Sequence, residues 1–352
     1  MGTVHKYRSV LGDLQRDITA GRYPAGSKLP SESVLIQRFR VSRITVRRAL
    51  AELERIGLID RVAGSGSFVR SMARAGLVFG LVIPNLGETE IFEPICQAIA
   101  ASPDAQGTVL MWGHADPREP REEQALALAG QWIERRVDGV FFAPLELSPH
   151  SAEINRRVME KLRAEKIPVV LLDRRPQEGP RCDLAGIDNH RAGSIATTHL
   201  RKLGAARIGF LGYLDQASTV QLRINGYRDA LEGAAGARIF LVPAEEQMRI
   251  SDEAMDCDAF VCANDRVAAR LMHALLARGV RIPQDVRIVG MDDVAYASLL
   301  PVPLTTVHQH CREIGEAALR LMLDRLARPN MAAREVLVDC ELVVRESCGG
   351  RS

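Results

Sequence analysis

The chain has 352 residues, 47% of them hydrophobic, so it holds enough apolar material for two or three domains rather than one. Its formal net charge of +2 is unevenly distributed, because residues 1–70 hold 13 lysines and arginines against 6 acidic residues and the remainder holds 33 against 38. A basic head on a mildly acidic body is expected when a phosphate-binding module is joined to a domain with a different task.

The cysteine spacing and the lengths of the apolar runs exclude several classes of protein. The seven cysteines are scattered, without CxxC spacing or a Cys/His cluster that matches a zinc site. We therefore expect free thiols in a reducing cytoplasm, and neither a metal nor a cofactor. No run of about 18 apolar residues could cross a membrane, and no signal peptide opens the chain, so we expect neither membrane insertion nor export.

Three amphipathic helices are predicted in the first 57 residues: over 5–20, from Pro30–Ser31 to about residue 39, and from Ser42 to Gly57. Only about three residues separate the second helix from the third, which is the tight turn of a helix-turn-helix. The side chains expected on the buried faces are Val10, Leu14 and Ile18; Val34, Leu35 and Phe39; and Val46, Ala49, Leu50, Leu53 and Ile56.

The third helix combines its apolar face with a cationic front. Ser42 stands at the N-cap position, and the opposite face opens with Arg43, Thr45, Arg47 and Arg48. Arginine can donate two hydrogen bonds to guanine, and threonine can contact a base edge or a thymine methyl, so this end of the helix suits the major groove of DNA. The alternative is a surface helix whose arginines are merely solvated.

A β-hairpin is predicted directly after this helix. Two short apolar runs within residues 58–70 flank the stretch Gly64 to Ser67. Behind a helix-turn-helix such a hairpin is a wing, whose glycine-rich tip can approach DNA closely. A phosphate-binding loop of an enzyme is the competing interpretation, but neither a lysine nor a helix start follows these glycines.

The run from Tyr7 through Val69 resembles the GntR-type winged helix-turn-helix. The resemblance rests on LPSESVLIQRF, VSRITVRRALAELERIGLI and GSGSFV. It implies that the recognition helix contacts bases and phosphates, that the wing tip enters the minor groove, and that a glutamate orients an arginine or contacts a base. Ser33 departs from the pattern, because many relatives have an arginine there. With Ser42 and Arg48 added from the start of the third helix, the residues predicted to take part in DNA binding are Glu32, Ser42, Arg43, Thr45, Arg47, Arg48 and Gly66.

Residues 71–76 are interpreted as a linker, which divides the chain into a DNA-binding domain (1–70), this linker and a body (77–352). In the body, strand-like runs alternate with helical stretches, which predicts an α/β fold with parallel sheets covered on both faces. A break near residue 180 indicates two lobes that enclose a cleft. The predicted strands are 77–84, 108–112, 139–143, 168–173, 207–212, 258–263, 287–292 and 304–309; the predicted helices are 91–101, 118–136, 150–166, 190–203, 219–233, 265–278 and 310–328.

Polar side chains gather where these strands end. Carboxylates accept hydrogen bonds from hydroxyls, arginine and asparagine donate them, and an aromatic ring covers an apolar sugar face, so the set predicts a site for a polyhydroxylated ring. Helix capping is the alternative, and for Asp265 it is the favoured one. Because two aspartates would repel a phosphate, we expect an unphosphorylated ligand. The predicted contacts are Phe92, Asp173, Thr219, Arg223, Asn264 and Asp292.

The body resembles the effector-binding domain of LacI/GalR-type repressors, which shares the periplasmic sugar-binding fold. The resemblance covers nearly all of residues 77–345, through VVLLDRRP, GIDNHRAGSIATTHLRKLGAARIGFLG, FVCANDRVAARLMHALLARGVRIPQDVRIVGMDDV and neighbouring runs. It implies the same six residues as effector contacts. Three departures stand out: an eroded strand and helix over 240–257, Cys311 at a position where relatives bring in another residue, and no hinge helix. A GntR-type head on this body is the layout of arabinose-repressor-type regulators.

These features predict a cytoplasmic, dimeric transcription regulator, a repressor, whose two heads bind a palindromic operator and whose effector is a monosaccharide. Two alternatives remain open: a sugar-binding or sugar-modifying protein whose basic head is incidental, and the same regulator with a purine-like effector. An enzyme is not expected, because Asp292 and Asp293 lack an accompanying nucleophile. His308 and His310 are expected to face solvent or to pack, and not to bind a metal.

Overall fold

The computed structural model separates into two compact units, Met1–Gly76 with Leu323–Met331, and Leu77–Met322 with Ala332–Ser352. We describe the head (residues 2–69) and the body (residues 76–350) separately. The predicted linker lies outside the described residues except for Gly76. The structure describes residues 2–19, 22–23, 26–55, 58–62, 65–69, 76–84, 90–113, 116, 118–146, 150–176, 178–214, 217–231, 236–243 and 248–350.

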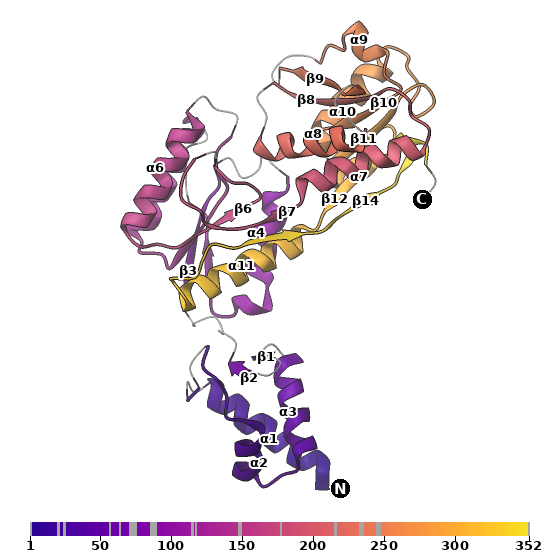
Figure 1. The fold of residues 1–352 in the computed structure, drawn as a ribbon. Helices are drawn as coiled ribbons and strands as arrows, with labels where there is room; N and C mark the ends of the chain where they lie inside the picture. Colours follow the sequence, from indigo (N-terminus) through magenta and orange to yellow (C-terminus); the bar gives the residue numbers. More distant parts are fainter. Residues whose placement is uncertain are drawn as a thin grey trace. The chain divides into compact units, whose positions relative to one another are not determined.

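The head contains the predicted helix-turn-helix and hairpin, as α1 (Gly2–Thr19), α2 (Glu32–Phe39), α3 (Arg43–Arg55), β1 (Ile59–Val62) and β2 (Gly66–Val69) (Figure 1). The prediction for Val34 was wrong, because Val34 is 49% exposed. Leu35 is fully buried in the core, and Ile36 and Phe39 pack against it partly buried. Ile56 and Gly57 lie outside the described residues. The core is formed by Val10, Leu14, Ile18, Leu29, Leu35, Val46, Ala49, Leu50, Leu53, Ile59 and Val69.

The wing is wider than the predicted hairpin. Strands β1 and β2 pair antiparallel, with Ile59 opposite Val69. The segment before α2 adds to the other edge of β2, because Lys28 bridges Phe68 and the Leu29 amide donates to the Ser67 carbonyl at 2.8 Å. This pairing fixes the wing against the start of the helix-turn-helix.

The first lobe of the body is a parallel six-stranded sheet in the order β13-β7-β6-β5-β3-β4. Its core is apolar, and the indole of the fully buried Trp132 donates to the Leu81 carbonyl at 2.8 Å. The strands are β3 (Val78–Val82), β4 (Val109–Met111), β5 (Gly139–Phe142), β6 (Val169–Leu172), β7 (Asp183–Ile187) and β13 (Glu335–Val338); the helices are α4 (Phe92–Ala101), α5 (Arg121–Glu134), α6 (Ser151–Ala164) and α11 (Cys311–Ala327).

The second lobe is another six-stranded sheet, in the order β14-β12-β11-β10-β8-β9, in which only the pairing of β14 with β12 is antiparallel. The strands are β8 (Ile208–Tyr213), β9 (Arg238–Val242), β10 (Ala259–Cys262), β11 (Arg287–Asp292), β12 (Thr305–Gln309) and β14 (Cys340–Val343); the helices are α7 (Asn189–Lys202), α8 (Ser218–Ala230), α9 (Asp252–Met255) and α10 (Asp265–Leu276).

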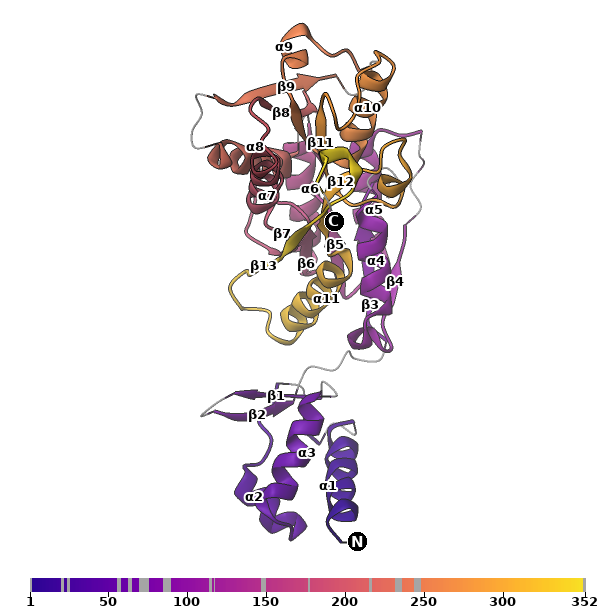
Figure 2. The ribbon, with the colours of Figure 1, turned by 90° about the vertical axis from the view of Figure 1, so that its right-hand side faces the viewer.

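The described chain passes between the lobes three times: from β7 to α7, from β12 to α11, and from β13 to β14. The first passage lies near residue 188, so the predicted break at 180 was placed too early. Helix α11 returns to the first lobe and lies beside α4, where a Cβ on Gly315 would stand 2.5 Å from the Ile95 carbonyl oxygen (Figure 2). The expected erosion over 240–257 was wrong for the strand, since β9 is present, whereas α9 has only four residues.

Candidate functional site

The recognition helix α3 begins as predicted, because the Thr45 amide donates to Ser42 Oγ at 3.3 Å and Ser42 is its N-cap. Thr45 itself was wrongly placed on the exposed face. Its side chain is buried, with 4% exposed, and its hydroxyl lies 2.9 Å from that of Ser42. Ile44 stands on the outer face instead, and 79% of it is exposed. The first turn therefore presents an apolar side chain where a hydroxyl was expected.

Arginines around Glu32 form the charged part of the head. Arg47 Nε donates to both carboxylate oxygens of Glu32 at 3.1 Å, while Arg61 and Arg43 approach the same carboxylate at 3.6 and 3.9 Å. Exposed ion pairs of this kind are worth about 0–1 kcal/mol, so a phosphate or a base can replace the carboxylate at little cost. Glu32 thus holds the arginines in the structure, and its role in DNA binding stays a prediction. Arg48 lies over the Tyr7 ring at 4.8 Å.

The wing tip requires glycine at position 66. Gly66 has a φ of +116°, and a Cβ there would lie 2.7 Å from Lys28 Cε. Lys28 therefore stands beside the tip and adds a cation that the sequence reasoning missed. Arg61, on the first wing strand, was missed in the same way. The alternation of the hairpin could have indicated Arg61, whereas the position of Lys28 depends on its pairing with β2.

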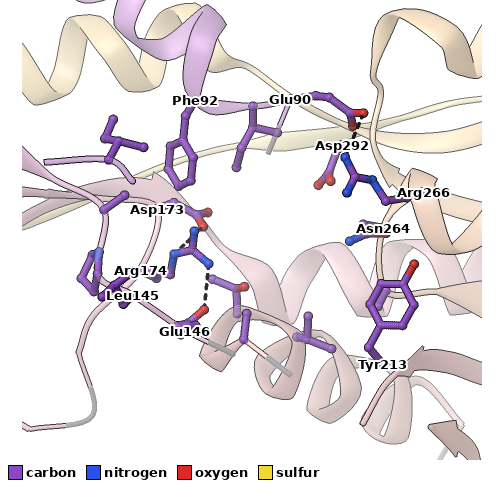
Figure 3. Close-up of a pocket in the computed structure, with 18 of the residues that line it drawn as sticks. Glu90, Phe92, Leu145, Glu146, Asp173, Arg174, Tyr213, Asn264, Arg266 and Asp292 are labelled. Atoms are coloured by element: carbon purple, nitrogen blue, oxygen red, sulfur yellow. Dashed lines mark hydrogen bonds and ion pairs between the residues drawn. The ribbon is translucent and has the colours of Figure 1, made fainter. Parts of the chain in front are cut away.

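The body contains a cavity of about 200 Å³ between its two lobes, and all six predicted effector contacts line it. Figure 3 labels four of them: Phe92, Asp173, Asn264 and Asp292. The cavity is smaller than the ~300–1,000 Å³ of typical drug-sized sites and suits a small metabolite. The first lobe contributes Phe92 and Asp173. The second lobe contributes Thr219, Arg223, Asn264 and Asp292.

Asp173 follows β6 in a left-handed conformation, with a φ of +67°. Its amide donates to the Ala185 carbonyl at 2.8 Å, which holds the residue against β7. The carboxylate is buried, and among the described residues its Oδ1 has no hydrogen-bond partner. Burial raises the pKa of Asp173, although the charges of Arg174 and Arg223 oppose that shift. Leaving a buried acceptor unpaired costs about 1–3 kcal/mol, which a hydroxyl donor would relieve.

Asp292 and Arg223 form the polar floor of the cavity on the second lobe. Gln309 Nε2 donates to Asp292 Oδ1 at 2.6 Å, and Arg223 Nη2 lies 3.5 Å from the same oxygen. The other arginine nitrogens donate to Asn189 Oδ1 at 2.8 Å and to the Ala263 carbonyl at 2.6 Å. Burial raises the pKa of Asp292 to about 6. These contacts fix both side chains before any ligand arrives.

The position of Arg223 is set by close helix packing. A Cβ on Gly193 would lie 2.0 Å from the Arg223 carbonyl oxygen, and one on Gly226 would lie 1.8 Å from the His190 carbonyl oxygen. Only glycines on α7 and α8 allow the two helices to approach so closely. Helix α7, which the run GIDNHRAGSIATTHL forms, therefore also helps to position the Arg223 guanidinium.

Asn264 was expected to contact the ligand and Asp265 to cap a helix, and the structure exchanges these roles in part. Asn264 is the N-cap of α10, because its Oδ1 accepts from the Val267 amide at 2.9 Å, and its amide nitrogen points toward the cavity (Figure 3). Asp265 is fully buried and does not cap this helix: it accepts from Thr306 Oγ1 at 2.6 Å and from the Val294 amide at 3.0 Å. Burial, with the nearby charge of Asp292, raises the pKa of Asp265 to about 8.

Sequence reasoning missed several charged residues of the cavity. Arg174 lies over the Phe92 ring at 5.1 Å and donates to Glu146 at 2.8 Å (Figure 3). The second oxygen of Glu146 accepts from the Ser218 amide at 2.7 Å, so this carboxylate joins the two lobes. Arg174 immediately follows Asp173 at the end of β6, and the same rule about strand ends could have identified it. The other missed residues are Glu90, Arg121 and Arg266.

A second cavity, of about 790 Å³, adjoins the first and shares Asp173, Arg174, Ala217 and Thr219 with it. Its lining includes the exposed Leu214, Leu222 and Leu337 and none of the polar floor residues of the second lobe. The smaller cavity is therefore the better candidate for specific recognition. Within the described residues, no group of three or more histidines, cysteines and carboxylates is placed to hold a metal ion, and no helix is long and apolar enough to cross a membrane.

Comparison with known families and structures agrees with this architecture. Residues 6–69 match the bacterial regulatory proteins of the gntR family, and residues 197–348 match the periplasmic binding protein-like domain. An arabinose metabolism transcriptional repressor from Geobacillus stearothermophilus is 26% identical and aligns over 98% of each chain. The transcription regulator GntR from Chromobacterium violaceum is 30% identical, with a TM-score of 0.60 over 78% of this chain and 100% of that chain.

A LacI family transcriptional regulator from Enterococcus faecium, solved with bound ribose, is 24% identical, with a TM-score of 0.63 over 77% of this chain and 98% of that chain. This likeness supports the two-lobed fold. The chain thus belongs to the transcription regulators that join a GntR-type winged helix-turn-helix head to a LacI-type, periplasmic-binding-protein-like effector domain.

Proposed function

We propose that the protein is a cytoplasmic repressor whose two heads bind a palindromic operator and whose affinity for that operator is set by a sugar-like effector bound between the lobes. The observation that carries the proposal is that all six predicted contacts line one cavity between the lobes of the body. The relative from G. stearothermophilus is named for arabinose metabolism, which supports an effector related to a sugar.

The DNA contacts follow from the chemistry of the head. Arg43, Arg47 and Arg48 lie exposed on the first two turns of α3, where guanidinium groups can bind guanine or phosphate. Gly66 and Lys28 place a flexible cation at the wing tip, suited to a neighbouring phosphate. Ser42 and Thr45 act through the helix start, because their hydroxyls bond to each other.

The effector contacts follow from the polar floor of the cavity. The unpaired Asp173 oxygen accepts from a ligand hydroxyl, and the Asn264 amide donates to one. Arg223 and Asp292 are held by neighbouring groups and need little reorganisation on binding. Phe92, covered on one face by Arg174, forms the apolar side. Thr219, at the start of α8, supplies a hydroxyl from the second lobe.

The switch requires that the effector favours one arrangement of the lobes. Glu146 already joins them through the Ser218 amide, and Tyr296 Oη of the second lobe lies 3.4 Å from Glu90 of the first. A ligand that binds Asp173 of the first lobe and the polar floor of the second lobe strengthens this arrangement. In a homodimer the resulting change in spacing of the heads alters operator affinity. A coupling of about 1–3 kcal/mol changes that affinity by about 5–150-fold.

The test begins with DNA selected by the full-length protein from random sequence. We expect a two-fold symmetric site, and binding that weakens as salt rises because counterions are released. Monosaccharides are then titrated into the complex. Sequence-independent binding, or a selected site without symmetry, would contradict the DNA-binding part of the proposal. Turnover of a sugar by the purified protein would instead favour an enzyme.

A further inference from the structure

The cavity in the body carries more positive charge than the sequence predicted. Four arginines line it, although only Arg223 was expected: the other three are Arg121, Arg174 and Arg266. They come from three different elements, the start of α5, the end of β6 and the first turn of α10. Three guanidinium groups that meet in one cavity from separate parts of the chain form a cluster that no single motif reveals.

The two glutamates that line the cavity are already held by neighbouring groups. Glu146 is held by Arg174 and by the Ser218 amide, and Glu90 lies 3.7 Å from Arg266 and 3.4 Å from Tyr296 Oη. Asp173 is buried and the Asp292 side chain is only 13% exposed, and burial raises the pKa of each. All four guanidinium groups stay charged near neutral pH, because the pKa of arginine lies far above it.

The surroundings of Arg121 favour an anion. It is the first residue of α5, a helix of 14 residues, so the positive end of the helix dipole adds to its charge. The N-cap residue, Pro120, supplies no side-chain hydrogen bond to the helix start. Burial lowers the pKa of Arg121, and the charges of Arg174 and Arg266 lower it further. Like charges in such proximity are stabilised when an anion binds among them.

We propose that the effector is a polyhydroxylated anion, either a sugar acid or a sugar phosphate. Its carboxylate or phosphate binds among Arg121, Arg174 and Arg266, while its hydroxyls reach Asp173 and Asp292. This rests on the proposed function and names the ligand class of the same site. It widens the expected ligands to include phosphorylated ones, because the expectation of an unphosphorylated ligand took account of the two aspartates and Arg223 but not of the three other guanidinium groups. Guanidinium groups bind carboxylate and phosphate through two parallel donors, so both kinds of ligand fit.

The experiment compares matched ligands on the full-length protein. Thermal unfolding and calorimetry are run with a neutral sugar, its sugar acid and its phosphate: glucose, gluconate, glucuronate and glucose 6-phosphate, and arabinose, arabinonate and arabinose 5-phosphate. We expect at least one anion to raise the melting temperature and to bind at least ten-fold more tightly than its neutral counterpart. The acid and phosphate arms show which anion fits. Binding of the anion should weaken with salt.

Two substitutions make the result specific. Arg121→Gln keeps a polar side chain and removes the charge, so it should weaken anion binding at least ten-fold and reduce the preference over the neutral sugar. Its melting temperature without ligand shows whether it folds. Arg156→Gln is the matched control, because Arg156 lies on α6 of the same lobe, pairs with Glu160 on the surface and does not line the cavity. It should bind the anion as the natural protein does.

The outcomes separate this inference from the proposed function. A neutral sugar that binds as tightly as its acid and phosphate, and releases the operator, overturns the anionic ligand and leaves the regulator intact. Unchanged anion binding by folded Arg121→Gln also overturns it. If neither neutral nor anionic sugars bind, the sugar-like effector of the proposed function fails together with this inference.

Discussion

Two sets of ion pairs, one in the head and one in the body, differ in how much water reaches them. In the head, the Arg47 side chain is 61% exposed and pairs with Glu32. In the body, the Arg223 side chain is 5% exposed and lies beside Asp292, which is 13% exposed. The exposed pair is easily exchanged for another anion, whereas the buried pair is fixed by its neighbours. The head thus suits a large polyanion, and the body a small ligand of defined shape.

The largest effect is expected from Arg223→Ala. The change leaves Asp292, Asn189 Oδ1 and the Ala263 carbonyl without their buried donor, so the body should lose about 3–5 kcal/mol of unfolding free energy. Urea unfolding measures this, with Arg156→Ala as the control for loss of a surface arginine. A loss below about 1 kcal/mol would mean that the buried pair is no more fixed than the exposed one.

The next effect is a pH dependence caused by Asp265. Its pKa is raised to about 8 in the folded protein, from the ordinary value of an exposed aspartate. The stability that it contributes is fully present below the unfolded pKa, near 4, and is lost as the pH rises through about 8. Between pH 5 and pH 8 the natural protein should therefore lose on the order of 2–4 kcal/mol relative to Asp265→Asn. Parallel pH profiles of the two proteins would contradict the raised pKa.

Removing Arg47 from the exposed pair should change operator binding and leave the stability of the head almost unchanged. Arg47→Ala should weaken operator binding by about 1–3 kcal/mol and relax base preference at one position of each half-site. The melting temperature of the head should hardly change, because the pair with Glu32 is exposed. Binding is measured at one fixed salt concentration. A variant that binds as the natural protein does would show that α3 does not read bases through this residue.

The smallest effect is expected from Ile44→Ala. The exposed side chain suits a thymine methyl, so its removal should cost up to about 1 kcal/mol at one base pair. Competition between operators that carry thymine or uracil at that position measures the contact. The same preference for thymine in both proteins would show that Ile44 faces solvent in the complex.

Regular elements of this chain were predictable because each has a local pattern. The buried parallel strands are continuous apolar runs, and the helices repeat at helical spacing. Four strands were not predicted. DLAGI opens with an acid and contains a glycine, and RIFLV falls in a segment that looked eroded. The strands EVLV and CELV are short, and each joins a different sheet. They can be identified as strands from the neighbouring strands with which they pair, and not from their composition.

The candidate site was predictable where it follows one simple rule. Side chains at the carboxyl ends of parallel strands meet, and this brought Asp173, Asn264 and Asp292 together. The rule does not give the burial of each side chain, so the roles of Asn264 and Asp265 were partly exchanged. It also missed Arg121, which lies at a helix start in the first lobe. On α3, Thr45 was assigned to the exposed face because its hydroxyl suits a base contact, although it lies four residues before the buried Ala49 and its hydroxyl bonds to Ser42.

The three passages of the chain between the lobes have a consequence for how the protein is made. By residue 187 a ribosome has released five of the six strands of the first sheet, but the helix α11 and the strand β13 emerge only after most of the second lobe. Neither lobe is formed by one continuous segment of the chain. Both should reach their final form almost together, late in synthesis, and the body should melt in one cooperative transition.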